Sequence, residues 1–150
     1  MRALEGIRVV ELATYVAAPS GGRVLADWGA EVIKVESPKM DIWRNYGKTF
    51  NGPANDDENP VFDVPNANKK NLCLDLKNPE AMEAFHKLLA TADVFITNNR
   101  PKPLKRMGLD YQSLKEKYPR LICGYVTGYG EEGPEAVSYT HLTLPTNSRV

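Results

Sequence analysis

The start of the chain alternates between short apolar runs and small or polar segments, which predicts a strand, a helix and a second strand. Residues 7–12 are mostly apolar and β-branched, as is typical of a strand buried on both faces. Pro19 suits the first turn of a helix and Gly29 suits its end. Residues 31–36 form the second apolar run, and a βαβ unit follows from this order. The predicted apolar face of the helix consists of Val24, Leu25 and Trp28.

A polar segment from residue 39 to 68 follows the second predicted strand. It is rich in Asn, Asp, Gly and Pro, which favour turns. Because aromatic side chains in such a segment usually pack on something, we expect one long ordered loop. The aromatic residues are Trp43, Tyr46 and Phe50.

Strands and helices continue to alternate in the second half of the chain. Residues 71–77 alternate leucines with polar residues, as a strand with one more polar face does. Asn78 and Pro79 predict the start of a helix whose apolar face runs from Met82 to Leu89. The other predicted elements are strands at 93–97 and 121–127 and helices at 104–108 and 110–118.

This order predicts an α/β fold with a doubly wound, Rossmann-like parallel sheet and helices on both faces. In such a sheet the ligand site lies beyond the carboxyl ends of the strands. The segments at those ends are residues 13–18, 36–39, 74–77, 98–100 and 127–130.

Composition favours a small-molecule partner over a macromolecule or a membrane. The 150 residues carry 19 Lys plus Arg and 19 Asp plus Glu, so no basic field favours nucleic acid. No apolar run approaches the ~20 residues of a membrane span, and the N-terminus lacks an export signal, so we expect a cytoplasmic protein. Cys73 and Cys123 lie far apart and are expected to be buried strand residues, with neither a disulfide nor a metal site.

The last residues differ in character from the rest of the chain. Residues 136–150 are rich in Thr, Ser, Pro and Asn, without a cap or a sustained period. Residues 137–146 resemble the translation of read-through into a sequencing adapter. We therefore expect a partial α/β domain over 1–135 and a non-native or disordered tail over 136–150, so that His141 belongs to no active site.

The residues at the predicted strand ends can be compared with two familiar kinds of site, a dinucleotide site and a site for a phosphorylated ligand. Glu36 stands where a dinucleotide site places the acid that holds a ribose, but residues 13–22 lack the GxGxxG pattern, which disfavours a nicotinamide enzyme. Arg100 and Arg106 follow a strand end, where cations suit a phosphorylated ligand. His86 lies beside apolar neighbours and is interpreted as structural. Further candidate cations are Lys69, Lys70, Lys77, Lys102 and Lys105.

Five sequence blocks in order resemble the family III CoA transferases, whose members include formyl-CoA, carnitine and bile-acid CoA transferases. The resemblance covers about residues 4–135, and within the family it is nearest to the clostridial enzymes that act on 2-hydroxy acids. The segments 66–70 and 124–134 carry this last refinement. The five blocks are residues 4–12, 25–36, 68–76, 98–101 and 127–130.

The resemblance implies coenzyme A as co-substrate, no metal, and CoA contacts along the predicted strand ends. Relatives often carry a basic residue where Pro38 stands, so Lys39 is expected to substitute for it. Val16 replaces a glutamine of formyl-CoA transferase, which argues against formyl or oxalyl substrates. The implied contacts are Val16, Ala17, Lys39, Leu74, Asp75, Leu76, Lys77, Asn98, Asn99, Arg100, Arg106, Thr127, Gly128, Tyr129 and Gly130.

The family chemistry implied by the resemblance uses an Asp that attacks an acyl-CoA thioester and forms a mixed anhydride. That Asp lies beyond Gly130 in relatives, and neither Asp75 nor Asp110 is at the matching place. We therefore expect an N-terminal fragment that lacks a catalytic residue, from a protein that forms interlocked homodimers and exchanges CoA between an acyl-CoA and a carboxylic acid. A racemase of the same superfamily and a non-catalytic CoA- or nucleotide-binding domain remain alternatives.

Overall fold

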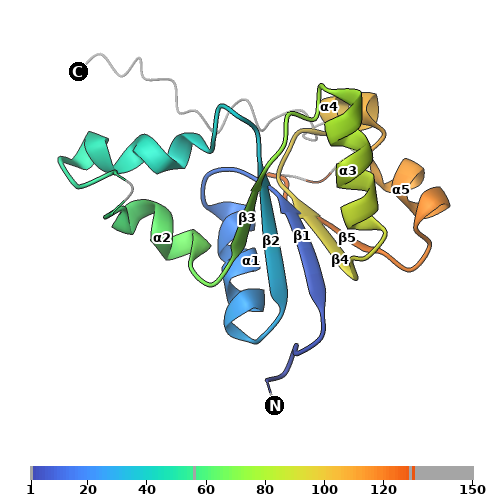
Figure 1. Ribbon diagram of the computed structural model, residues 1–150, viewed down its shortest axis with the longest axis horizontal. Coiled ribbons are helices and arrows are strands. Elements are labelled where there is room, and N and C mark those ends of the chain that lie inside the picture. The colour runs from blue at the N-terminus through green and yellow to red at the C-terminus, as the bar shows by residue number, and fades with distance from the viewer. Residues whose placement is uncertain (1, 56, 129, 131–150) are drawn as a thin grey trace.

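Five parallel strands form the centre of the protein in the computed structural model, which describes residues 2–55, 57–128 and 130. The strands lie in the order β3-β2-β1-β4-β5, and each neighbouring pair is parallel. Their carboxyl ends therefore meet at one edge of the sheet, the upper edge in Figure 1. The strands are β1 (Arg8–Leu12), β2 (Glu31–Glu36), β3 (Lys70–Cys73), β4 (Val94–Thr97) and β5 (Ile122–Tyr125).

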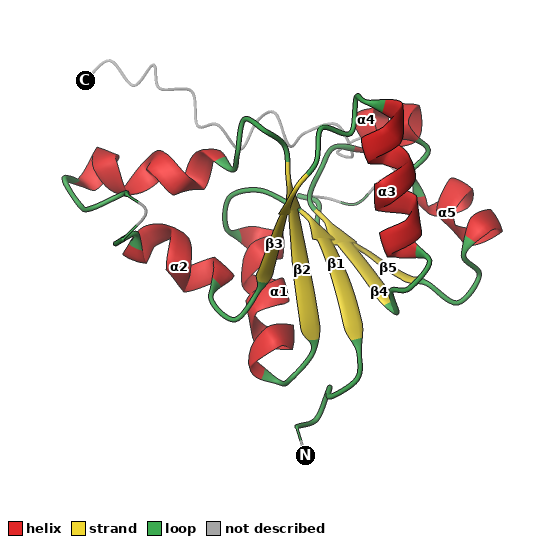
Figure 2. Cartoon of the chain, viewed as in Figure 1, coloured by secondary structure: helices red, strands yellow, loops and turns green. Residues whose placement is uncertain are grey.

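Helices lie on both faces of the sheet, which confirms the predicted doubly wound α/β architecture. They are α1 (Ala17–Asp27), the 3-10 helix η1 (Ile42–Phe50), α2 (Pro60–Asn66), α3 (Pro79–Leu89), α4 (Pro101–Met107) and α5 (Tyr111–Lys117). In Figures 1 and 2, α1 and α2 lie on one side of the strands, and α3, α4 and α5 lie on the other. The connections from strand to helix run along the upper edge of the sheet.

The face of the sheet covered by α3, α4 and α5 is held by large apolar side chains, and we call it the apolar face. Phe85 of α3 meets Phe95 of β4 edge to face, with ring centroids 6.2 Å apart. Burial of each such side chain contributes about 1.5–3 kcal/mol. The buried cluster consists of Val10, Leu12, Val35, Phe85, Leu89, Phe95, Leu104, Leu109, Leu114 and Leu121.

The opposite face, covered by α1 and the segment from η1 to α2, combines a small apolar cluster with charged residues, and we call it the charged face. Its apolar cluster consists of Val9, Ala26, Ala30 and Val32. Side chains alternate along a strand, so Glu11 shares the face of Val9, and Lys34 that of Val32. Both charged side chains are fully buried.

The segment predicted as one long loop contains two helices, so that prediction is wrong. Asp41 caps η1 by accepting from Trp43 N, and Asn59 caps α2 by accepting from Phe62 N. The expectation that the aromatic side chains pack is confirmed, because the Trp43 and Tyr46 rings stack 4.3 Å apart. Turn-forming residues here act as helix caps, and the sequence pattern does not separate the two roles.

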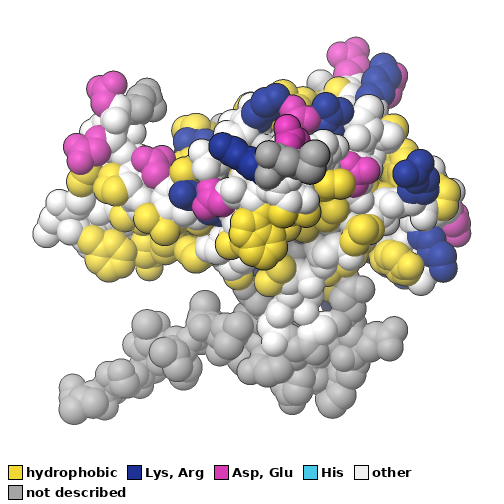
Figure 3. Space-filling view, turned by 90° about the horizontal axis from the view of Figure 1, so that it is seen from below, with side chains coloured by type: hydrophobic (Ala, Val, Ile, Leu, Met, Phe, Trp, Pro, Cys, Tyr) yellow, Lys and Arg dark blue, Asp and Glu magenta, His cyan; other side chains and the backbone are white. Residues whose placement is uncertain are grey.

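The predicted apolar face of α1 is wrong for two of its three residues, whereas Leu25 packs against the apolar cluster of the charged face. Val24 and Trp28 are 45% and 56% exposed. The helix instead turns its small residues Ala18, Gly22 and Ala26 towards the sheet. Small side chains let the helix approach the buried charges closely. Figure 3 shows apolar side chains exposed on the surface seen from below.

Strand β3 is shorter than predicted and lies at the edge of the sheet. It ends at Cys73, and residues 74–77 belong to the loop that leads to α3. All four residues of β3 are exposed, so the expectation of a buried Cys73 is wrong, while Cys123 is half-buried. An edge strand has one neighbour and less cover, which the leucine alternation alone does not reveal.

Candidate functional site

The loops after the strand ends form one edge of the molecule, which we call the rim. The predicted contact residues lie in or next to these loops, except that Arg106 lies in the last turn of α4. Tyr129 lies outside the described residues. The residues at the rim are Val16 and Ala17 after β1, Lys39 after β2, Leu74, Asp75, Leu76 and Lys77 after β3, Asn98, Asn99 and Arg100 after β4, and Thr127, Gly128 and Gly130 after β5.

Asn98 joins the β4 loop to the β1–α1 turn. Its Oδ1 accepts from Thr14 N at 3.0 Å, and its Nδ2 donates to Thr14 O at 2.8 Å. Next to it, buried Thr97 donates from Oγ1 to Leu12 O at 2.6 Å and accepts from Asn99 N at 3.1 Å. The Asn98 side chain therefore hydrogen-bonds to the protein backbone and fixes the β1–α1 turn.

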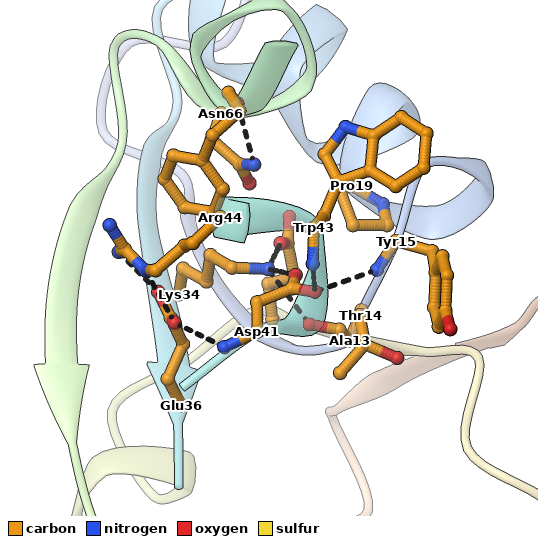
Figure 4. A network of polar contacts seen from close by, with 12 residues as sticks. Ala13, Thr14, Tyr15, Pro19, Lys34, Glu36, Asp41, Trp43, Arg44 and Asn66 are labelled. Atoms are coloured by element: carbon orange, nitrogen blue, oxygen red, sulfur yellow. Dashed lines mark hydrogen bonds and ion pairs between the residues drawn. The ribbon is translucent and has the colours of Figure 1, made fainter. Parts of the chain in front are cut away.

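Asp41 and Lys34 hold the other side of the same turn (Figure 4). Lys34 Nζ donates to Ala13 O at 2.8 Å, and Tyr15 N donates to Asp41 Oδ1 at 3.1 Å. The Asp41 carboxylate lies 3.1 Å from Lys34 Nζ. Two charged side chains from β2 and from the loop before η1 thus fix the backbone on both sides of Thr14.

These contacts belong to a buried network of two carboxylates and two ammonium groups, which we call the four-charge network: Glu11, Lys34, Asp41 and Lys69. Glu11 lies between the lysines, 3.3 Å from Lys34 Nζ and 2.7 Å from Lys69 Nζ. Lys69 Nζ also donates to Pro19 O and to Asn66 Oδ1. The formal charges sum to zero, so burial leaves no net charge uncompensated.

Burial shifts the pKa values of two members of the four-charge network in opposite directions. It raises the pKa of the Glu11 carboxyl above its ordinary value, although the charges of Lys69 and Lys34 act against this shift. Burial likewise lowers the pKa of the Lys69 ammonium, against the attraction of Glu11. Both shifts have the same physical origin, because desolvation disfavours the charged form of each group.

Glu36, at the end of β2, is buried and forms an ion pair with the partly exposed Arg44 beside the network. It binds Arg44 of η1 through two hydrogen bonds of 2.9 and 2.6 Å, accepts from Asp41 N at 2.8 Å, and is also bound by Asn71. Burial alone would raise the pKa of Glu36, but the hydrogen bonds from Arg44 and Asp41 N outweigh burial and hold the pKa below its ordinary value. This fully engaged carboxylate is a structural group of the rim.

Two rim residues other than glycine have left-handed backbone conformations. Tyr15 has φ 62° and Met40 has φ 60°. This conformation costs a residue with a side chain about 1–2 kcal/mol, so surrounding contacts must hold it. Tyr15 is 45% exposed and Met40 is 56% exposed. The rim therefore displays two apolar side chains from two adjacent, strained loops.

The candidate cations divide into two groups in the structure. Lys69 is buried in the four-charge network, and Lys70 pairs at 2.5 Å with Glu31, the first residue of β2, so neither serves the rim. This corrects the suggestion that either could bind phosphate there. The exposed cations that pair with no carboxylate within the described residues include Lys39, Lys77, Lys102, Lys105, Arg100 and Arg106.

Sequence reasoning missed the four-charge network and the roles of Asp41 and Asn98. One signal was available, because Glu11 and Lys34 interrupt runs that otherwise indicate strands buried on both faces. A charge inside such a strand requires a partner, and in the structure these two residues are register partners of β1 and β2. His86 is structural as expected, since its Nδ1 lies 3.0 Å from Tyr118 Oη.

Comparison with known proteins identifies relatives of the chain. The (R)-2-hydroxy-4-methylpentanoate CoA-transferase of Clostridioides difficile is 50% identical over 131 residues, which are 87% of this chain and 33% of the relative. The cinnamoyl-CoA:phenyllactate CoA-transferase of Clostridium sporogenes is 48% identical over 87% of this chain and 32% of the relative. The chain thus spans about a third of the length of these proteins.

Solved structures and a family model agree with these relatives. The crystal structure of a CAIB/BAIF family protein from Brucella suis superposes with a TM-score of 0.81 at 40% identity, over 90% of this chain and 36% of that protein. The model of CoA-transferase family III matches residues 4–141. Sequence, fold and the order of the rim loops lead to one assignment: the chain belongs to CoA-transferase family III.

Proposed function

We propose that this chain is the CoA-binding part of an enzyme that moves CoA between an acyl-CoA and a carboxylic acid. Family membership and the rim support the proposal together. The observation that carries it is the difference between the two groups of cations. Buried lysines are paired with carboxylates, whereas Lys39, Lys77 and Arg100 are exposed beside rim loops without a carboxylate partner among the described residues.

The chemistry of the rim supports CoA as its ligand. The nucleotide end of CoA carries several phosphate charges, and unpaired lysine and arginine side chains suit such an anion. The pantetheine arm is long and largely uncharged, and the apolar Val16 and Ala17 at the start of α1 suit it. In this proposal Leu74 to Lys77, Asn99 and Arg100 surround the nucleotide, Arg106 binds a phosphate, and Thr127 to Gly130 close the wall.

The acyl group is proposed to be that of a 2-hydroxy acid. Two relatives at 50% and 48% identity have names that specify a 2-hydroxy acid, 2-hydroxy-4-methylpentanoate or phenyllactate. Val16 offers no polar group to a small, charged acyl unit, which is consistent with a larger and less polar substrate. The C. sporogenes name also specifies the CoA thioester of an unsaturated acid, cinnamoyl-CoA.

The proposed chemistry needs a carboxylate that attacks the thioester carbonyl and expels CoA thiolate, which leaves an acyl anhydride on the enzyme. Glu11, Glu36 and Asp41 are buried in ion pairs, and Asp110 caps α5. We therefore assign the nucleophile to none of these residues. What the described residues contribute is binding and orientation of CoA and a rigid rim.

The whole protein is proposed to work as a cytoplasmic homodimer whose chains interlock. None of the described helices is long and apolar enough to cross a membrane. The exposed Val24 and Trp28 of α1 are apolar surface that a larger assembly could cover.

Isothermal titration calorimetry of this chain with CoA tests the proposed site. We expect a Kd of about 1 mM or tighter, and Arg100→Gln should weaken binding about fivefold to tenfold because a charge-assisted phosphate contact is lost. Lys117→Gln is the matched control, since it removes one exposed positive charge from the last turn of α5, away from the rim. Absence of binding by the unmodified chain, or equal weakening by both variants, would contradict the proposal.

A further inference from the structure

The backbone of the β1–α1 turn is held by side chains that come from other elements. Lys34 Nζ binds Ala13 O at 2.8 Å, and Asn98 binds both Thr14 N and Thr14 O. Asp41 Oδ1 accepts from Tyr15 N at 3.1 Å. Four consecutive polar atoms of one turn are thus fixed from β2, from the β2–η1 loop and from the β4–α4 loop.

Asp41 is the member of this set that connects two rim loops directly. Its Oδ1 accepts from both Tyr15 N and Trp43 N, the latter at 3.0 Å. Its Oδ2 lies 3.1 Å from Lys34 Nζ but accepts no hydrogen bond among the described residues. Its own N–H donates to Glu36 Oε2 at 2.8 Å. Figure 4 shows this carboxylate between the turn and the start of η1.

The burial and charge of Asp41 make it a rigid anchor. The side chain is 0% exposed, and both backbone donors approach one oxygen of a carboxylate, which is the stronger class of hydrogen bond. Lys34 compensates the charge of the buried carboxylate. An acceptor fixed in this way imposes its position on the two amides that it binds.

The turn needs such an anchor because Tyr15 is strained. Its φ of 62° costs about 1–2 kcal/mol, which the chain would recover by relaxing if the acceptor were removed. The Tyr15 ring also contacts the Trp43 ring, with centroids 5.9 Å apart. Val16, the N-cap of α1, follows immediately, so any relaxation of Tyr15 moves the first residues of α1.

We infer that Asp41 is a positioning residue for the CoA site: through its buried carboxylate, the β2–η1 loop sets the conformation of Tyr15 and thereby the placement of Val16 and Ala17 against the pantetheine arm. Asn98 acts on the same turn from the opposite side. The inference rests on the proposed function, because it assigns to these residues an effect on CoA affinity and not only on folding.

The test compares variants that remove or keep the acceptor on this chain. Asp41→Ala should weaken CoA binding about tenfold and accelerate exchange of the Tyr15 amide, because the hydrogen bond is lost. Asp41→Asn keeps an oxygen acceptor and should bind CoA within about threefold of the unmodified chain, although it loses the ion pair. Asn98→Ala should weaken CoA binding and accelerate exchange of the Thr14 amide without changing any charge. Asp63→Ala, at an exposed position of α2, is the control.

Calorimetry gives the affinity, amide exchange by NMR gives the state of the turn, and thermal unfolding gives the folded fraction. The inference is overturned if Asp41→Ala and Asn98→Ala lower the Tm but leave the affinity of the folded chain at the unmodified value. It is also overturned if Asp41→Asn is as damaging to affinity as Asp41→Ala. A lack of CoA binding by the unmodified chain instead refutes the proposed function, and amide exchange then decides whether Asp41 orders the turn at all.

Discussion

The two faces of the sheet are stabilised by different interactions although they share the same strands. On the apolar face, Phe85, Phe95 and several leucines fill space without directional bonds. On the charged face, Glu11 and Lys34 occupy positions of equal burial and depend on partners at 3.3 Å or less. Apolar packing tolerates changes of shape at constant volume, whereas a buried ion pair fails when one partner is removed.

The two faces also differ in their relation to the candidate site. The charged face carries the groups that reach the rim, since Lys34 binds the β1–α1 turn and Glu36 binds the start of the β2–η1 loop. The apolar face reaches the rim through apolar contacts, since Leu74 and Leu76 pack against its buried cluster. Directional bonds specify the position of a loop, and apolar contacts specify mostly that it is packed.

The largest effect is expected for a methionine substitution on the charged face, compared with a methionine substitution at an equally buried position of the apolar face. Lys34→Met leaves Asp41 without its cation and Glu11 with one partner only, and it should lower the free energy of unfolding by about 3–5 kcal/mol. Leu89→Met on the apolar face conserves volume and should cost less than about 1.5 kcal/mol. Urea unfolding measures both. Equal costs would remove the distinction between the faces.

A cavity on the apolar face should have the next largest effect. Leu89→Ala removes a side chain that is 1% exposed, and the unfilled space should cost about 3 kcal/mol. Leu88→Ala, the half-buried neighbour in α3, should cost clearly less because solvent fills part of the space. If the two variants have the same urea midpoint, α3 does not pack on the sheet as described.

The sequence specified the apolar face better than the charged face. β2 was predicted with its observed bounds, and the stripe from Met82 to Leu89 packs as expected, because apolar periodicity records which side is buried. The same reasoning assigned Val24 and Trp28 to the wrong side of α1. Reasoning from periodicity assumes that large apolar residues face the core. In α1 the small residues face the sheet instead, because buried charges lie there.

The candidate site could be predicted only to the level of loops. Parallel strands place the residues after each strand at one edge, so the rim follows from the order of elements. The roles of individual side chains depend on pairs distant in sequence, such as Asn98 with Thr14 or Asp41 with Lys34. A single sequence contains no signal for these pairs beyond the charge in a buried strand.

The ion pair of buried Glu36 with Arg44 makes the stability of the charged face depend on pH. The folded-state pKa of Glu36 lies below its ordinary value, so its contribution is present above the unfolded pKa and is lost as the pH falls through the folded pKa. Glu36→Gln should therefore lower stability by about 2 kcal/mol at pH 7 and by much less at the acid end. Urea unfolding between pH 7 and pH 3 follows the difference.

The control for this prediction is Glu116→Gln, which makes the same change at an exposed position of α5. Its difference from the unmodified chain should stay small and nearly constant over the same pH range. A Glu36→Gln difference that did not shrink towards acid would mean that the carboxylate is not stabilised in its charged form by Arg44.

The smallest effects should come from two adjacent glycines of α1, and they should differ in sign. A Cβ on Gly22 would overlap the Glu11 carboxylate, whereas a Cβ on Gly21 meets no described atom within 4 Å. In Gly22→Ala, overpacking of about 1–3 kcal/mol exceeds the gain of about 0.5–1 kcal/mol in helix propensity, so a net loss of about 1 kcal/mol is expected. Gly21→Ala should show the gain alone. Stabilisation by both variants would mean that α1 lies too far from the four-charge network to constrain it, and the close contact between helix and buried charge would then be absent in solution.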